Sequence, residues 1–289
     1  MTKRTHVHAD GFHFRTMKRG EVDLAVDWAA SEGWNPGLDD AACFHAADPD
    51  GFLIGLVGDD PVAVISVVRY GASFAFLGFY IVRPDQRGKG YGLRIWNAGM
   101  AALEGRNVGL DGVVDQQDNY RKSGFRLAYR NIRYQGTADS TREHAADIVP
   151  LASLDFDSVA RYDRAFFPDD RTTFLQHWIA QPRARAAAVL EDHRIAGYGV
   201  MRECRNGYKV GPLFADRPEL ADRLFAYFRS HARANAPLFL DVPDQNPAAL
   251  DLVTRHGMHP VFETARMYTG AIPEMPMDRL FGVTSFELG

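Results

Sequence analysis

Residues 87–92, RGKGYG, combine three glycines with two cations and closely follow an apolar run at 74–82. The run predicts a strand, and apolar residues at spacings of three and four over 91–103 predict a helix after the glycines. Backbone N–H groups at such a strand-to-helix turn can bind an anion, since glycine has no Cβ to block a bulky phosphate. Arg87 and Lys89 would add positive charge at the rim. We therefore expect a phosphate-bearing ligand at this loop.

The spacing of the loop excludes two common nucleotide-binding motifs. Lys89 precedes Gly90 and no Ser or Thr follows, so the loop does not match G-x-x-x-x-G-K-[ST]. The glycines fall at alternate positions, which does not match G-x-G-x-x-G either. The pattern that remains is R-x-x-G-x-G, formed by Arg87, Gly90 and Gly92.

Three motifs together resemble the GCN5-related N-acetyltransferase (GNAT) superfamily. They are the R-x-x-G-x-G loop, the V-x-P at residues 82–84 and a Y-x-x-x-G-F that begins at Tyr120, and the resemblance in element order covers about residues 12–135. The resemblance implies a mixed α/β fold, acetyl-CoA as donor, and a strand that splays from its neighbour to pair with the pantetheine arm. The implied coenzyme-binding residues are Phe79, Tyr80, Ile81, Val82, Arg87, Gly88, Lys89, Gly90, Tyr91 and Gly92.

The resemblance also places Tyr120 beside the coenzyme sulfur. A phenol with a pKa near 10 can protonate a departing thiolate, so Tyr120 is the candidate general acid, although tyrosines also pack as structural residues. Only about one alkylamine in a thousand is unprotonated at neutral pH, so a base would help. Many family members carry a glutamate on the central strand, but 74–82 contains no carboxylate. Asp111, Asp115 and Glu32 are alternatives.

The expected acceptor is a small-molecule amine. Glu32, Trp34 and Asn35 lie in the region where the family places its substrate-facing helices and loop, and Phe79 could line the same pocket. Two other functions stay open. The protein could sense acyl-CoA without turning it over, or it could acylate a hydroxyl or a protein lysine.

The chain also contains an internal repeat. Each half contains a turn between two strand-like runs, and the two turns begin 133 residues apart. The same offset separates Gly124-Phe125 in the first half from Gly257-Met258 in the second. We therefore expect two tandem GNAT-like domains, a coenzyme-binding domain at 1–136 and a degenerate one at 150–289, with the boundary in the polar stretch 136–144. In the second half Val253 replaces the tyrosine, and the glycine loop is absent after 209–213.

This second half could stabilise the first or supply a wall of the acceptor pocket. Asp241, Asp244 and Glu263 could attract an ammonium group, although surface carboxylates are usually solvated. The apolar run 278–288 is expected to dock as a strand.

Composition limits the class of partners. A formal net charge of −4 offers no basic field for nucleic acid. No run of 18 apolar residues and no apolar leader occur, so we expect a cytoplasmic protein that does not enter a membrane. Cys43 and Cys204 follow no metal-binding spacing, and no metal is expected.

Overall fold

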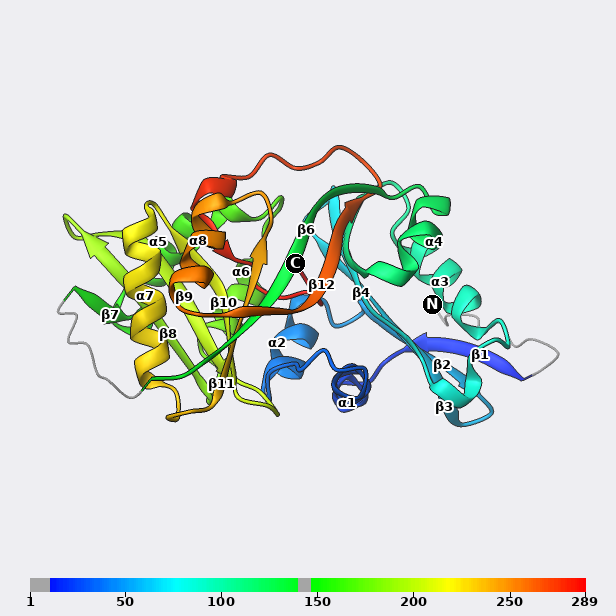
Figure 1. Ribbon diagram of the computed structural model, residues 1–289. Helices are drawn as coiled ribbons and strands as arrows, with labels where there is room; N and C mark the ends of the chain where they lie inside the picture. The colour runs from blue at the N-terminus through cyan, green and yellow to red at the C-terminus, as the bar shows by residue number, and fades with distance from the viewer. Residues whose placement is uncertain (1–10, 140–146) are drawn as a thin grey trace.

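The computed structural model describes residues 11–139 and 147–289, so residues 140–144 of the expected boundary lie outside the described residues. The two halves repeat one order of elements (Figure 1). The first half contains β1 (Phe12–Thr16), α1 (Glu21–Ser31), α2 (Asp40–Ala47), β2 (Phe52–Val57), β3 (Asp60–Tyr70), β4 (Phe74–Val82), α3 (Tyr91–Ala102), β5 (Asn107–Val113), α4 (Gln117–Lys122) and β6 (Arg126–Thr137). The second half contains β7 (Ile148–Pro150), α5 (Phe156–Asp163), α6 (Thr172–Trp178), β8 (Ala184–Glu191), β9 (Arg194–Glu203), β10 (Tyr208–Ala215), α7 (Pro218–His231), β11 (Pro237–Pro243), α8 (Pro247–Arg255), β12 (His259–Tyr268) and β13 (Leu280–Gly282). The predicted repeat is confirmed.

Local sequence explains where several helices begin. Asn246 caps α8, because its side-chain oxygen accepts hydrogen bonds from the N–H groups of Ala248 and Ala249 at 3.1 and 3.2 Å. Pro247 and Pro218 occupy the first positions of α8 and α7, where the missing N–H has no intrahelical partner to lose. Both helices then bury an apolar stripe against the sheet.

The strands of both halves form one sheet in the order β1-β2-β3-β4-β5-β12-β6-β11-β10-β9-β8-β7, with β13 paired to β10. The last long strand of each half is exchanged. β12 of the second half pairs with β5 of the first, and β6 of the first half pairs with β11 of the second. β6 and β12 run side by side between the halves (Figure 1). Each half therefore completes the sheet of the other.

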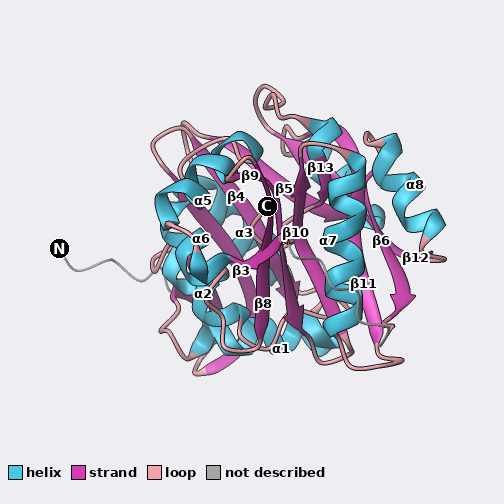
Figure 2. Ribbon diagram, turned by 90° about the vertical axis from the view of Figure 1, so that its left-hand side faces the viewer, coloured by secondary structure: helices cyan, strands magenta, loops and turns pink. Residues whose placement is uncertain are grey.

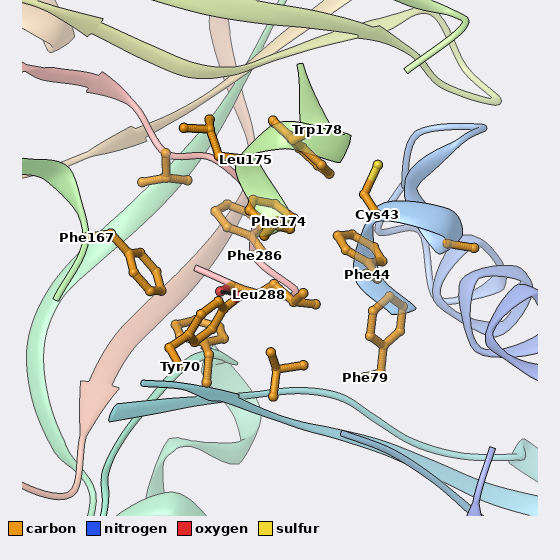
Figure 3. Packing of buried hydrophobic residues seen from close by; sticks show 14 of the residues in the cluster. Cys43, Phe44, Tyr70, Phe79, Phe167, Phe174, Leu175, Trp178, Phe286 and Leu288 are labelled. Atoms are coloured by element: carbon orange, nitrogen blue, oxygen red, sulfur yellow. Dashed lines mark hydrogen bonds between the residues drawn. The ribbon is translucent and has the colours of Figure 1, made fainter. Parts of the chain in front are cut away.

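Helices cover both sides of the sheet, with α2, α5 and α6 on one side and α7 and α8 on the other (Figure 2). One core joins α1 and α2 of the first half to α5 and α6 of the second and to the C-terminal segment. In it Phe44 of α2 stacks on Trp178 of α6 with ring centroids 5.8 Å apart, beside Phe286 and Leu288 (Figure 3). Such a shared core makes the halves one folding unit.

Buried ion pairs also cross the seam between the halves. Each is an arginine of one half with an aspartate of the other, and the three pairs are Arg133–Asp241, Arg202–Asp40 and Arg266–Asp111. A buried charge that loses its partner is very costly, so these pairs tie the halves in one arrangement.

Among the described helices, none has the length and apolar character needed to cross a bilayer. Both cysteines are free and buried, and burial raises the pKa of the Cys43 thiol to about 12.

Candidate active site

β4 separates from β5 in the middle of the first half. The two strands pair in parallel from Phe74 with Asn107 to Leu77 with Leu110, although β4 continues to Val82. The register between β3 and β4 shifts at this point, and Phe79 adopts a positive φ of 47°. An extra residue in one strand bends it away from its partner. Beyond Leu77, β4 has no ladder partner in β5, which is the predicted splay.

The glycine loop closes one end of this opening. Gly88 and Gly90 have φ angles of +77° and +84°, a left-handed conformation that glycine adopts without strain. A Cβ at either position would meet no atom within 4 Å, so this side of the loop is open. Gly90 directly precedes α3, whose N–H groups face the loop with the positive end of the helix dipole. A Cβ at Gly92 would lie 2.8 Å from the hydroxyl oxygen of Tyr80.

The splay and the loop line a cavity of about 580 Å³. Of the expected coenzyme-binding residues, those that line it are Phe79, Tyr80, Ile81, Val82, Arg87, Gly88, Gly90, Tyr91 and Gly92. Lys89 does not, because its Nζ donates to the side-chain oxygen of Gln86 at 2.9 Å. Glu32, Trp34 and Tyr120 line the same cavity.

Tyr120 lies on α4 at the side of the cavity, and only 7% of it is exposed. Its ring stacks on Trp96 with centroids 5.6 Å apart, which fixes its direction. Burial, together with the neighbouring Tyr80, raises the pKa of Tyr120 well above the usual value for tyrosine. The phenol therefore keeps its proton at neutral pH and can donate it.

The three candidate carboxylates have different environments. The side chain of Asp111 is fully buried and forms a bidentate ion pair with Arg266 at 3.0 and 2.6 Å, so its oxygens are already used. Glu32, at the end of α1, pairs with Arg87 of the glycine loop across the cavity. Asp115 lines the cavity and is exposed. Asp111 therefore has no free carboxylate oxygen with which to accept a proton from the amine.

The second half contributes a wall of the cavity. Phe262 and Thr264 come from β12, and Phe286 comes from the C-terminal segment. The sequence indicated that the second half could form such a wall, but the residues it suggested there were Asp241, Asp244 and Glu263. The local sequence carries no signal for Phe262 or Phe286, since both reach the cavity through the strand exchange and the return of the C-terminus.

Several expected acceptor residues have other partners. Asn35 does not line the cavity, because its side-chain amide exchanges hydrogen bonds with the backbone of Asn206 in the second half. Asp241 is buried against Arg133, and Glu263 lies 3.4 Å from Arg130. Asp244 accepts from the backbone N–H of Arg130.

The matching opening in the second half is filled by the chain itself. β10 and β11 pair in parallel only as far as Val210 with Leu240. β13 then pairs with β10 at Leu213 and Phe214, and the N–H of Val283 donates to the carbonyl of Asp241 on β11. The C-terminal segment therefore takes the place that in the first half is open. Of the run 278–288 that was predicted to form a strand, Leu280–Gly282 forms one. The buried residues that follow turn back toward β4.

Comparison with known proteins places this architecture in a family. The acetyltransferase (GNAT) family model matches residues 21–125, and an acetyltransferase (GNAT) domain model matches residues 159–282. A holothin acyltransferase from a Pseudoalteromonas species is 30% identical over 269 residues, which cover 93% of this chain and 92% of that protein. The chain belongs to the GNAT acyltransferases.

Solved GNAT structures have the same fold. A Pyrococcus horikoshii protein assigned to the acetyltransferases has a TM-score of 0.83 at 21% identity, covering 98% of both chains. A tandem GNAT protein from the clavulanic acid biosynthesis pathway has a TM-score of 0.62 at 13% identity, covering 90% of this chain and 99% of that one. The tandem α/β arrangement predicted from the sequence is thus confirmed, and the protein is an acyltransferase that uses an acyl-CoA donor.

Proposed function

We propose that this GNAT acyltransferase moves an acetyl group from acetyl-CoA directly to a primary amine of a small molecule. The observation that carries the proposal is a single cavity that joins the glycine loop, the part of β4 that no longer pairs with β5 and Tyr120. In this proposal the pyrophosphate lies on the N–H groups at 88–92, and the pantetheine arm pairs with β4 beyond Leu77.

The chemistry assigned to Tyr120 follows from its environment. The amine nitrogen attacks the thioester carbonyl, a C–N bond forms, the C–S bond breaks, and the sulfur leaves as a thiolate. Tyr120 donates its proton to that sulfur and recovers one from the amine nitrogen through solvent. A group with a strongly raised pKa is a weak acid in its ground state, but it donates readily to a thiolate that develops beside it.

The entering amine must be neutral. Asp115 and Glu32 are the cavity carboxylates that are not buried in ion pairs, and either could accept the ammonium proton directly or through water. The relative named a holothin acyltransferase supports transfer of an acyl group to an acceptor rather than binding of the coenzyme alone. A sensor that only binds acyl-CoA would not need a protonated phenol in the cavity.

Two measurements test this function. Acetyl-CoA titrated into the protein should bind at one site per chain, and thiol release should depend on added amine. Tyr120→Phe should retain acetyl-CoA affinity and lower kcat by about 100-fold or more, the range of general acid catalysis. Binding without amine-dependent thiol release would support the sensor, and full turnover by Tyr120→Phe would remove Tyr120 from the acid role.

A further inference from the structure

Three aromatic residues line the part of the cavity that the glycine loop does not form. Trp34 follows α1, Phe262 lies on β12, and Phe286 lies in the C-terminal segment. The loop and β4 are assigned to the donor in the proposed function, so an acceptor must enter along the remaining wall. We call Trp34, Phe262 and Phe286 the aromatic box.

One buried side chain holds all three members of the aromatic box. The Nη1 of Arg133 donates to the backbone carbonyl of Trp34 at 2.6 Å. The guanidinium carbon lies 4.8 Å from the ring centroid of Phe286 and 5.7 Å from that of Phe262. Stacking of this kind is favourable, and most of all away from water. Arg133 thus contacts the rings of Phe262 and Phe286 and the backbone of Trp34.

Arg133 itself has little freedom. Its Nε and Nη2 donate to the two carboxylate oxygens of Asp241 at 2.7 and 2.8 Å, and the two side chains are 3% and 2% exposed. The bidentate geometry fixes the plane of the guanidinium. Asp241 neutralises the charge of Arg133, and Arg133 does not line the cavity, so the residues of the box that line it are aromatic.

The charges around the cavity limit the acceptor further. The charged residues that line it are Glu32, Arg87, Asp111 and Asp115. Among these described residues Arg87 is the one cation, it belongs to the glycine loop, and it pairs with Glu32. Lys209 is buried behind the box, where its Nζ donates to the carbonyl of Trp34 at 3.2 Å, and it does not line the cavity. At the cavity surface near the box, a carboxylate on the acceptor would therefore meet acidic groups, whereas an ammonium group would be attracted.

We propose that the aromatic box selects a primary amine attached to a planar aromatic or heteroaromatic ring without a carboxylate, and that Arg133 is its positioning residue. This inference rests on the proposed function. Planar rings stack on aromatic walls with specific geometry, whereas a saturated ring of the same size has no face to match. The box needs both halves, so the degenerate half acts as part of the acceptor site.

The test compares three acceptors with acetyl-CoA as donor. 2-Phenylethylamine and 2-cyclohexylethylamine differ in ring planarity, and phenylalanine adds a carboxylate to the first. We expect kcat/KM for 2-phenylethylamine to exceed that for 2-cyclohexylethylamine by about 2- to 12-fold. We expect phenylalanine to be at least about tenfold poorer, which corresponds to one unfavourable charge contact.

Variants test the assignment of the box. Phe286→Leu should abolish the preference for the planar ring and leave the acetyl-CoA Kd unchanged. Arg133→Lys should raise KM for 2-phenylethylamine by about tenfold with kcat within about threefold, because Lys cannot keep the bidentate and stacked geometry. Arg202→Lys is the matched control. Arg202 is equally buried, pairs with Asp40 and stacks 4.1 Å over Trp178 outside the box.

The outcomes separate the two proposals. Failure of acetyl-CoA to bind, or thiol release that no amine stimulates, would overturn the proposed function. Normal acetylation with equal kcat/KM for the planar and saturated amines, unchanged in Phe286→Leu, would overturn only the aromatic box. If Arg202→Lys raised KM for 2-phenylethylamine as much as Arg133→Lys, the role of Arg133 would be general stability.

Discussion

The variant Asp111→Ala is expected to unfold more easily than the wild-type protein but to keep its acyltransferase activity. The side chain of Asp111 on β5 is fully buried, and its carboxylate accepts four hydrogen bonds. Two come from Arg266 of β12 at 3.0 and 2.6 Å, one from Asn131 of β6 at 2.8 Å, and a long one from Thr264 at 3.4 Å. The variant leaves the guanidinium of Arg266 buried without its counter-charge.

Removing one partner of a buried ion pair lowers the free energy of unfolding by about 3–5 kcal/mol. A cooperative unit of this length has an unfolding entropy of about 0.6 kcal/mol/K near its Tm, so the Tm should fall by about 5–8 °C. Replacing both partners, as in Asp111→Ala with Arg266→Met, should restore part of the loss, since no buried charge is then left alone.

Thermal unfolding and steady-state kinetics distinguish the two possible roles of Asp111. If the residue is structural, kcat measured well below the Tm should stay within about threefold of the wild-type value. Arg266→Met should lower the Tm by a similar amount. A wild-type Tm combined with a fall in kcat of about 100-fold or more would identify Asp111 as the base and contradict a structural role.

Three further predictions concern the cavity. The raised pKa of Tyr120 keeps its phenol protonated, so kcat/KM should rise with pH as the amine deprotonates and should not fall again below about pH 10. A decline in kcat/KM between about pH 8 and 10 would contradict Tyr120 as the general acid. Glu32→Gln should tighten acetyl-CoA binding by up to about fivefold in calorimetry, because the exposed pair with Glu32 competes with the phosphates for Arg87. Arg87→Gln should weaken acetyl-CoA binding. In Gly78→Ala the new Cβ would overlap the carbonyl oxygen of Glu287, so the free energy of unfolding measured in urea should fall by about 1–3 kcal/mol. An unchanged midpoint of the urea unfolding curve would argue against close packing of Gly78 on Glu287.

The donor side of the site could be predicted from the sequence because its signals are local. The glycine loop lies between a strand and a helix that are adjacent in the chain, and its geometry depends on residues such as Gly88 and Gly90 that tolerate positive φ. Tyr120 was assigned from a short motif, and the structure places it in the same cavity. The repeat was visible because each half keeps the same order of elements.

The acceptor side could not be predicted in the same way. Alternating apolar residues identify a strand but do not say which strand it pairs with. The pairing of β12 with β5 joins residues about 150 positions apart, and it brings Phe262 to a cavity that the first half begins. Nothing in the local sequence around Asp111 or Asp241 indicates the buried arginines that pair with them, Arg266 and Arg133.

The sequence by itself determined the glycine-rich turn at 87–92 and the position of Tyr120 four residues before a Gly-Phe pair, and the family resemblance implied the splay of the strand before the turn. The tertiary structure decided which half stays open. β13 fills the opening between β10 and β11, while the opening between β4 and β5 remains a cavity. The physical reason is that hydrogen bonds within a turn involve neighbours in the chain, whereas burial of charge and closure of a sheet depend on segments that only folding brings together.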